Sequence, residues 1–238
     1  MDEPTFTLSF DIDTDEDIKA MPRTLDILDD FDIKAGFACT GKHIIERFSV
    51  FRKAIKDGHE IINHTQDHPD NFGKLSFKAQ YEQILSFYGT AKEYLNYTPK
   101  GFRVPHFGHY WSRELYGVMV KAGVQYSSST IAHRCDHVIP YDYQQGRIKI
   151  KEFPLSPCPE HPHGILDTWH SLNRGVGKHT NNFLETFNKL VDSAIKYNSY
   201  ANVYFDPQDL TELMLVGICK KLVDSEIKIK KYEDMLGD

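Results

Sequence analysis

The chain has few cysteines, little tryptophan and no long apolar run. Two of its 238 residues are tryptophan and four are cysteine, namely Cys39, Cys135, Cys158 and Cys219. The cysteines stand far apart and form no C-x-x-C pair, which excludes a zinc ribbon or a dithiol redox motif and favours free thiols in a reducing compartment. No apolar stretch approaches the roughly 20 residues of a membrane helix.

A surplus of positive charge is also missing. The chain has 28 Lys and Arg against 34 Asp and Glu, a net charge of −6, so we expect neither nucleic acid nor an anionic membrane as a partner. The start of the chain, Met1-Asp-Glu-Pro, lacks the basic and apolar regions of a signal peptide. We therefore expect a cytoplasmic protein and leave homo-oligomerisation open.

The apolar content predicts one α/β domain. Apolar residues make up 40% of the chain, enough for a large core, and no linker or repeat divides residues 1–238. Apolar runs expected to form strands lie at 5–10, 34–39, 60–63, 101–103, 125–128, 146–153 and 201–205. Segments of helical period lie at 15–30, 42–56, 76–95, 112–122, 180–197 and 209–223. About seven such units predict a parallel sheet closed, or nearly closed, into a (β/α)7-type barrel.

Two stretches give less regular signals. Residues 131–173 are rich in Pro, His and Gly, and we expect them to be irregular apart from the strand at 146–153. Residues 226–230 would form a last short strand or extend the preceding helix.

Chemically active side chains follow the expected strands, at the end where a barrel of this type assembles its active site. They are Asp11 and Asp13, His64 and His68, Arg103, and Asp206. This regularity predicts that residues far apart in sequence converge on one centre.

Two imidazoles and one carboxylate are a ligand set for a hydrolytic divalent metal, with a second carboxylate left as a base. His64 and His68 provide the imidazoles, and Asp11 and Asp13 the carboxylates. The alternative for the carboxylates is a helix N-cap cluster around Thr14. The alternative for the histidines is a solvated pair, because the chain has 12 histidines.

Three further residues have both a structural and a functional interpretation. Arg103 would pair with a surface carboxylate, or it would orient Asp11 and keep it ionised. Asp167 and Trp169 would belong to a packed loop, or they would form an aromatic wall with a polar partner for a sugar ring. The histidines between His161 and His179 match no ligand spacing that we trust.

The chain resembles the polysaccharide deacetylase family, the NodB-homology deacetylases of carbohydrate esterase family 4. The matching segments are Ser9-Phe-Asp-Ile-Asp13 for F-D-x-D, His64-Thr-Gln-Asp-His-Pro69 for H-[ST]-x-x-H-P, Arg103-Val-Pro105 for R-x-P and, loosely, Asp167-Thr-Trp169. The second segment matches at every defined position and is the most specific.

The resemblance implies a distorted barrel that removes acyl groups from sugars with one divalent metal, usually zinc. It makes Asp13, His64 and His68 the metal ligands and Asp11 the general base. The other catalytic residues would be Arg103, Asp167 and Asp206, and the substrate contacts would be Pro105, His106, Trp169 and His170.

The fifth motif departs from the family pattern. A histidine that serves as general acid usually ends the late strand, whereas this chain reads Asn202-Val-Tyr-Phe-Asp-Pro207. Either the Asp206 carboxylic acid donates the proton, or His106 or His170 does, or activity is weak or lost.

We therefore expect a metal-dependent hydrolase of a C–N amide bond, most simply an N-deacetylase or deformylase of an amino sugar or glycan intermediate. The alternatives are an allantoinase-like hydrolase of small ureides or cyclic amides, and a weakly active or non-catalytic relative that binds carbohydrate or metal.

Overall fold

The computed structural model describes residues 3–106, 114–161, 164–173 and 183–237. Its strands are β1 (Thr5–Ile12), β2 (Gly36–Cys39), β3 (Glu60–Asn63), β4 (Gly101–Phe102), β5 (Tyr126–Ser127), β6 (Tyr141–Gln145), β7 (Ile148–Glu152), β8 (Tyr200–Phe205) and β9 (Lys228–Ile229). Its α-helices are α1 (Asp15–Asp30), α2 (Gly41–Lys56), α3 (Phe77–Leu95), α4 (Glu114–Lys121), α5 (Phe183–Lys196) and α6 (Glu212–Val223). Shorter helical segments are η1 (Phe72–Lys74), η2 (Trp169–Asn173), η3 (Pro207–Asp209) and η4 (Glu233–Met235).

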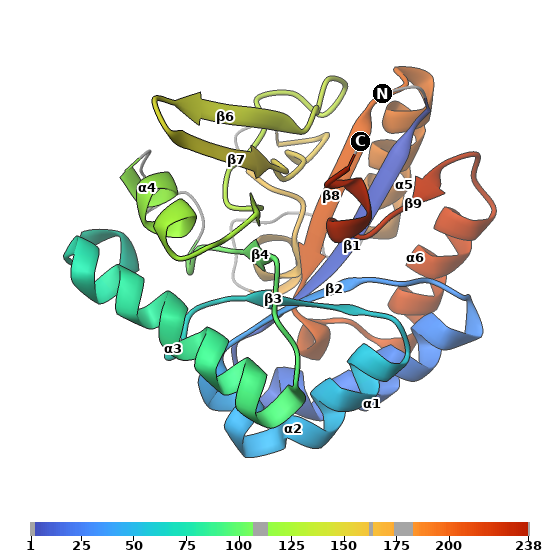
Figure 1. The fold of residues 1–238 in the computed structure, drawn as a ribbon. Coiled ribbons are helices and arrows are strands. Elements are labelled where there is room, and N and C mark those ends of the chain that lie inside the picture. The colour runs from blue at the N-terminus through green and yellow to red at the C-terminus, as the bar shows by residue number, and fades with distance from the viewer. Residues whose placement is uncertain (1–2, 107–113, 162–163, 174–182, 238) are drawn as a thin grey trace.

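The strands form one twisted sheet in the order β6-β7-β5-β4-β3-β2-β1-β8, with β9 paired to the start of β1. Figure 1 shows α1, α2 and α3 along the lower side of this sheet and α5 and α6 on its right. The gap between β7 and β8 is bridged where the Ser156 amide donates to the Asn202 carbonyl (2.8 Å). The fold is therefore the expected distorted (β/α)7-type barrel.

The alternation of β1 separates an apolar outer layer from a polar interior. Phe6, Leu8 and Phe10 belong to the main core cluster under the helices. Ser9 and Asp11 point the other way and hydrogen-bond Arg103. Because side chains alternate across a strand, one short sequence supplies both the packing and the polar residues of the interior.

Local capping explains why the first helices begin where they do. Thr14 and Asp17 form a reciprocal capping box at α1, and the side chains of Thr40 and Ser76 cap α2 and α3. Such caps satisfy the backbone N–H groups that a helix start leaves unpaired. They place the start of α1 directly after β1, next to Asp13.

The expectation that residues 131–173 are irregular apart from one strand was wrong for β6. This strand pairs antiparallel with β7 through a turn at Gly146, whose φ is +59°, and the hairpin projects at the upper left of Figure 1. Four of its five residues are exposed, and apart from Tyr141 and Tyr143 the strand is polar, so the sequence signal for a strand is weak there.

The expected strand 201–205 ends where predicted and begins one residue earlier, at Tyr200, but the next helix begins later than 209. Pro207–Asp209 form the short helix η3, and α6 follows from Glu212. Ser112, the expected cap of the helix at 112–122, lies outside the described residues.

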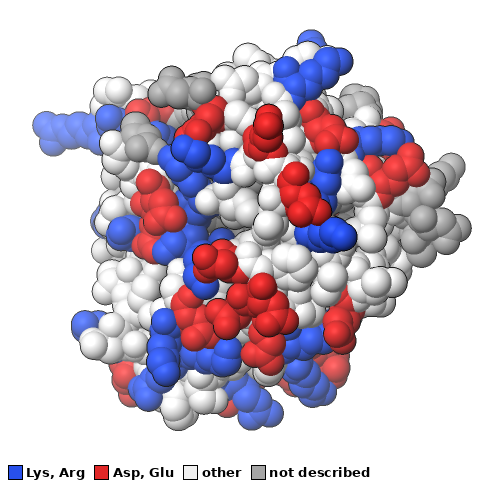
Figure 2. Space-filling view, turned by 90° about the vertical axis from the view of Figure 1, so that its right-hand side faces the viewer, with Lys and Arg blue, Asp and Glu red and all other residues white. Residues whose placement is uncertain are grey.

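Charged side chains of both signs lie next to one another on the face shown in Figure 2. Ion pairs among the described residues include Lys221 with Asp192 (2.5 Å) and Lys34 with Asp32 (3.4 Å). Among the described helices, none combines the length and the apolar character of a membrane span.

Candidate active site

Asp13, His64 and His68 converge beside the ends of β1 and β3. One ligand atom of each lies within 4.8 Å of the others. Asp13 Oδ1 is 3.2 Å from His64 Nε2, and Asp13 Oδ2 is 3.4 Å from His68 Nε2. The three predicted ligands are therefore brought together, although their role as ligands stays a prediction.

Buried polar atoms that make no hydrogen bond suit this group to a cation. Asp13 Oδ1 and His68 Nε2 are buried without a hydrogen-bond partner among the described residues, which is uncommon for buried polar atoms. His64 Nδ1 lies 2.8 Å from the Arg103 carbonyl oxygen. If that nitrogen donates, Nε2 is left with its lone pair toward Asp13 and His68, as a metal-binding imidazole requires. A carboxylate and two imidazoles fit zinc and similar divalent ions.

The loop after β3 turns both imidazoles to one side. The Thr65 amide donates to Asn63 Oδ1 (2.9 Å), and the His68 amide donates to Thr65 Oγ1 (3.0 Å). Thr65 and His68 have left-handed backbones, with φ of 71° and 53°. Side-chain hydrogen bonds to the backbone thus hold a conformation that non-glycine residues rarely adopt.

The charges within this group stabilise one another. Burial alone would raise the pKa of Asp13, but the His64 and His68 imidazoles lower it overall. Burial would lower the pKa of His64, but Asp13 raises it overall. Binding of a divalent cation by His64 would compete with protonation of its imidazole.

Asp11 and Arg103 form a buried ion pair beneath Asp13, His64 and His68, the three metal-type ligands. Arg103 Nη1 donates to Asp11 Oδ1 at 2.5 Å, and the Arg103 side chain is fully buried. Burial raises the pKa of Asp11, while the guanidinium works in the opposite direction. The surface-pairing alternative for Arg103 is therefore wrong, because the arginine pairs with the buried Asp11. The expectation that it keeps Asp11 ionised is not borne out, since burial outweighs the guanidinium and the pKa of Asp11 is raised overall.

Asp206 and Asp167 lie on a second side of the site. Thr168 Oγ1 donates to Asp206 Oδ2 (3.2 Å), and Tyr204 donates to Asp167 Oδ2 (2.8 Å). Burial raises the pKa of Asp206 well above its usual range, and the nearby Asp13 raises it further. Asp206 therefore holds a proton more readily than an exposed aspartate does.

The Asp13 and Asp206 segments are joined through Asp17. Asp17 Oδ2 accepts from the Asp13 amide (3.3 Å), and Asp17 Oδ1 accepts from the Gln208 amide (3.2 Å). Burial raises the pKa of Asp17 to about 6. The helix-cap interpretation is therefore correct for Asp17 and Thr14, and it coexists with the convergence of Asp13 on the histidines.

The predicted substrate-contact residues differ in their distance from the metal-type ligands and in their burial. The His106 ring lies 4.7 Å from the His68 ring, and its Nε2 is 3.2 Å from Asp70 Oδ1. Pro105 is buried, whereas Trp169 in η2 is 39% exposed. The side chain of His170 lies outside what the structure describes, as do His163 and His179 of the histidine-dense region. These roles stay predictions.

The sequence predictions missed several interior residues that surround the ion pair. They are Ser9, Ser128, Asn202, Tyr204 and Tyr232. A two-residue spacing from Asp11 could have indicated Ser9, and positions two and four residues before Asp206 could have indicated Tyr204 and Asn202. Nothing in the local sequence around Tyr232 indicates its position.

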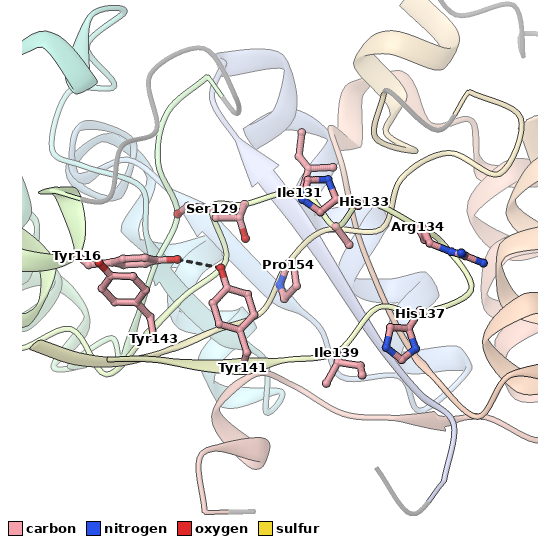
Figure 3. A pocket seen from close by; sticks show the side chains of 12 residues that line it. Tyr116, Ser129, Ile131, His133, Arg134, His137, Ile139, Tyr141, Tyr143 and Pro154 are labelled. Carbon is pink, nitrogen blue, oxygen red and sulfur yellow. Dashed lines mark hydrogen bonds between the residues drawn. The ribbon is translucent and has the colours of Figure 1, made fainter. Parts of the chain in front are cut away.

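A cavity of about 930 Å³ lies between the β6–β7 hairpin, α4 and residues 129–139. Tyr116, Tyr141 and Tyr143 line one side, and His133 and His137 stand on the other (Figure 3). The three metal-type ligands are not among its described lining residues. The sequence did not indicate this cavity because the hairpin that bounds it was missed.

A comparison with protein-family models matches residues 1–134 to the polysaccharide deacetylase model. The chain belongs to the polysaccharide deacetylase family. Deacetylases of this family use a divalent metal ion, and Asp13, His64 and His68 form a group among the described residues that could hold one. The match includes the first three motifs and ends before Asp167 and Asp206.

The similar curated proteins are matched over short segments. Peptidoglycan-N-acetylglucosamine deacetylase PgdA of Listeria monocytogenes is 29% identical over 85 residues, which are 36% of this chain and 18% of that protein. This chain therefore spans under a fifth of that relative.

Solved structures share the fold at low identity. A candidate polysaccharide deacetylase from Mycobacterium smegmatis is 15% identical, with a TM-score of 0.80, over 100% of this chain and 90% of that one. The Streptomyces lividans family 4 carbohydrate esterase, in complex with acetate, is 15% identical, with a TM-score of 0.63, over 95% and 91%. A family 4 pseudoenzyme from Bacillus anthracis is 15% identical, with a TM-score of 0.64, over 98% and 66%.

Proposed function

We propose that this polysaccharide deacetylase family member is a metal-dependent hydrolase of the C–N amide bond in an N-acetylated or N-formylated amino sugar or glycan intermediate. The observation that carries the proposal is the convergence of Asp13, His64 and His68, with unpaired atoms, beside the buried Asp11–Arg103 pair. We further propose zinc as the metal, because imidazole and carboxylate ligands suit it.

The ligand group would hold the metal, which when bound acts as a Lewis acid that acidifies water and polarises an acyl oxygen. Asp11 acts as the base that accepts a proton from the attacking water at a carboxylate oxygen. Arg103 Nη1 donates to Asp11 Oδ1 and thereby fixes the orientation of the carboxylate. Asp206, whose pKa is raised by burial, would be the acid that donates a proton to the departing nitrogen. His106 is the competing donor, since its ring contacts that of His68.

A second candidate function is binding of carbohydrate or metal without turnover. Its support is Asp206, which stands where the family pattern has the acid histidine, and the family 4 pseudoenzyme from Bacillus anthracis shares the fold. Bound metal without release of acetate or formate from any acyl substrate would favour this function over hydrolysis.

The test combines metal analysis with a screen for acetate and formate release from acylated amino sugars and small cyclic amides. We expect one divalent ion per chain and release from an amino sugar. Asp13→Asn should lose the metal. Asp11→Asn should keep the metal and lose hydrolysis. Asp142→Asn, at an exposed position on β6, is the matched control and should behave as the wild type.

Two outcomes would contradict the assignment. Loss of metal in Asp11→Asn with activity preserved in Asp13→Asn would reverse the two roles. Release only from small cyclic amides would move the substrate to the ureide class. The proposal includes a cytoplasmic site of action, where nucleotide-linked or lipid-linked amino sugars would be the substrates, and cell fractionation tests that location.

A further inference from the structure

The C-terminal segment of the chain enters the barrel interior. β9 pairs with the first residues of β1, and Thr7 Oγ1 donates to the Lys230 carbonyl (2.9 Å). Tyr232 follows and is fully buried. Its ring stacks on Tyr126 at 5.2 Å between centroids and also packs against Phe153 at 5.4 Å. Residues near the end of the sequence therefore reach the polar centre from the side opposite the metal-type ligands.

The Tyr232 hydroxyl is oriented by Asn202. Asn202 Nδ2 donates to the carbonyl oxygens of Phe153 (2.9 Å) and Pro154 (3.2 Å), which fixes which way its amide points. Asn202 Oδ1 then faces Tyr232 and accepts the phenol proton at 2.6 Å. A phenol has one proton to donate, so this contact leaves its oxygen lone pairs for other partners.

Arg103 donates a hydrogen bond to one of those lone pairs. Its Nη2 donates to the Tyr232 oxygen at 2.7 Å, a shorter contact than those to Ser9 Oγ (3.0 Å) and Ser128 Oγ (3.1 Å). Its Nη1 donates to Asp11 on the other side. The guanidinium is planar and rigid, so the position of one nitrogen sets the position of the other.

We propose that Tyr232 is a positioning residue: its hydroxyl, fixed by Asn202, holds Arg103 in the plane in which the guanidinium meets Asp11. This inference rests on the proposed hydrolytic function, in which Asp11 is the base. It assigns a role in catalysis to a residue outside the segment that the family model matches, which ends at residue 134.

Tyr232→Phe deletes the hydroxyl and keeps the ring packing. With zinc-loaded protein and 4-nitrophenyl acetate as the acyl probe, we expect kcat to fall about 10- to 100-fold, because small misplacements of catalytic groups have effects of this size. KM should stay within about twofold and zinc content should not change. Tyr200→Phe is the matched control, since Tyr200 is also a buried interior tyrosine and its hydroxyl has no partner among the described residues.

A double-mutant cycle with Arg103→Lys tests whether Tyr232 acts through the arginine. Lysine keeps a charge near Asp11 but lacks the rigid fork, so removing the Tyr232 hydroxyl in that background should lower kcat by less than about threefold. Equal effects of Tyr232→Phe in both backgrounds, or a Tyr232→Phe variant as active as Tyr200→Phe, would overturn the proposal.

Failure of the proposed function is recognised separately. If the zinc-loaded wild type hydrolyses no acyl probe, the same cycle is read from urea unfolding midpoints. The midpoint shift caused by Tyr232→Phe should then be smaller in the Arg103→Lys background than in the wild type. Equal shifts would show that the hydroxyl does not hold Arg103.

Discussion

Glu60 should make the stability of the protein depend on pH. This carboxyl group lies at the start of β3 and is fully buried. Its Oε1 accepts from the Tyr126 hydroxyl (2.5 Å), and its Oε2 accepts from the Glu233 amide (3.3 Å). Burial, only partly offset by the Tyr126 hydrogen bond, raises its pKa from 4.5 to about 8.

The direction of the effect follows from proton binding. Between pH 4.5 and about pH 8, the folded protein keeps the Glu60 proton while the unfolded chain releases it. The folded state therefore binds more protons, and the free energy of unfolding falls as pH rises through this window. Each pH unit between the two pKa values lowers the free energy of unfolding by about 1.36 kcal/mol. By about pH 8 the total loss is on the order of 3–5 kcal/mol.

Urea unfolding of the wild type and Glu60→Gln between pH 5 and 9, with chelator present, measures this loss. Glutamine resembles the protonated carboxyl group and does not titrate, so the wild type should lose about 3–5 kcal/mol more than the variant across this range. Titrating groups that do not interact with Glu60 contribute equally to both proteins, so the comparison isolates Glu60 and the groups coupled to it, such as Glu233. Tyr126→Phe removes a donor that favours the ionised form, so it should raise the folded-state pKa and extend the fall to higher pH. Parallel profiles for wild type and Glu60→Gln would refute the reasoning.

Three further predictions concern other parts of the molecule. Asp206→Asn should lower kcat about 10²- to 10⁴-fold if this residue is the general acid; full activity there, with loss in His106→Ala, would transfer the role to the histidine. Phe37→Ala should cost about 3–5 kcal/mol of unfolding free energy, because its buried ring stacks on that of a neighbouring phenylalanine at 5.2 Å. The exposed Phe77→Ala should cost within about 0.5 kcal/mol, and similar losses in the two would show that burial does not set the cost. Burial raises the pKa of Cys39 well above its usual range, so this thiol should resist a thiol reagent until urea unfolds the protein, and rapid native-state labelling of Cys39 would contradict this.

The sequence alone determined the features that depend on local pattern. The apolar run at 5–10 predicted a buried strand that leads into Asp11, although β1 continues to Ile12. The spacing of His64 and His68 predicted a metal-type pair after β3. Strand ends share one face in a parallel barrel, so the convergence of these residues with Arg103 also followed. The exposed strand β6 has no such pattern, which is why the hairpin was missed.

Only the tertiary structure decided how the interior of the barrel is filled. Asn202 could be related to Asp206 by its spacing, but its amide is oriented by carbonyls about fifty residues earlier in the chain. Tyr232 contacts Arg103, which lies 129 positions earlier in the sequence. The residues around Tyr232 are mostly charged or polar and form no motif that would predict this contact. Contacts of this kind depend on the closure of the sheet and on the path of the chain through it, and neither is encoded in the residues immediately around Tyr232.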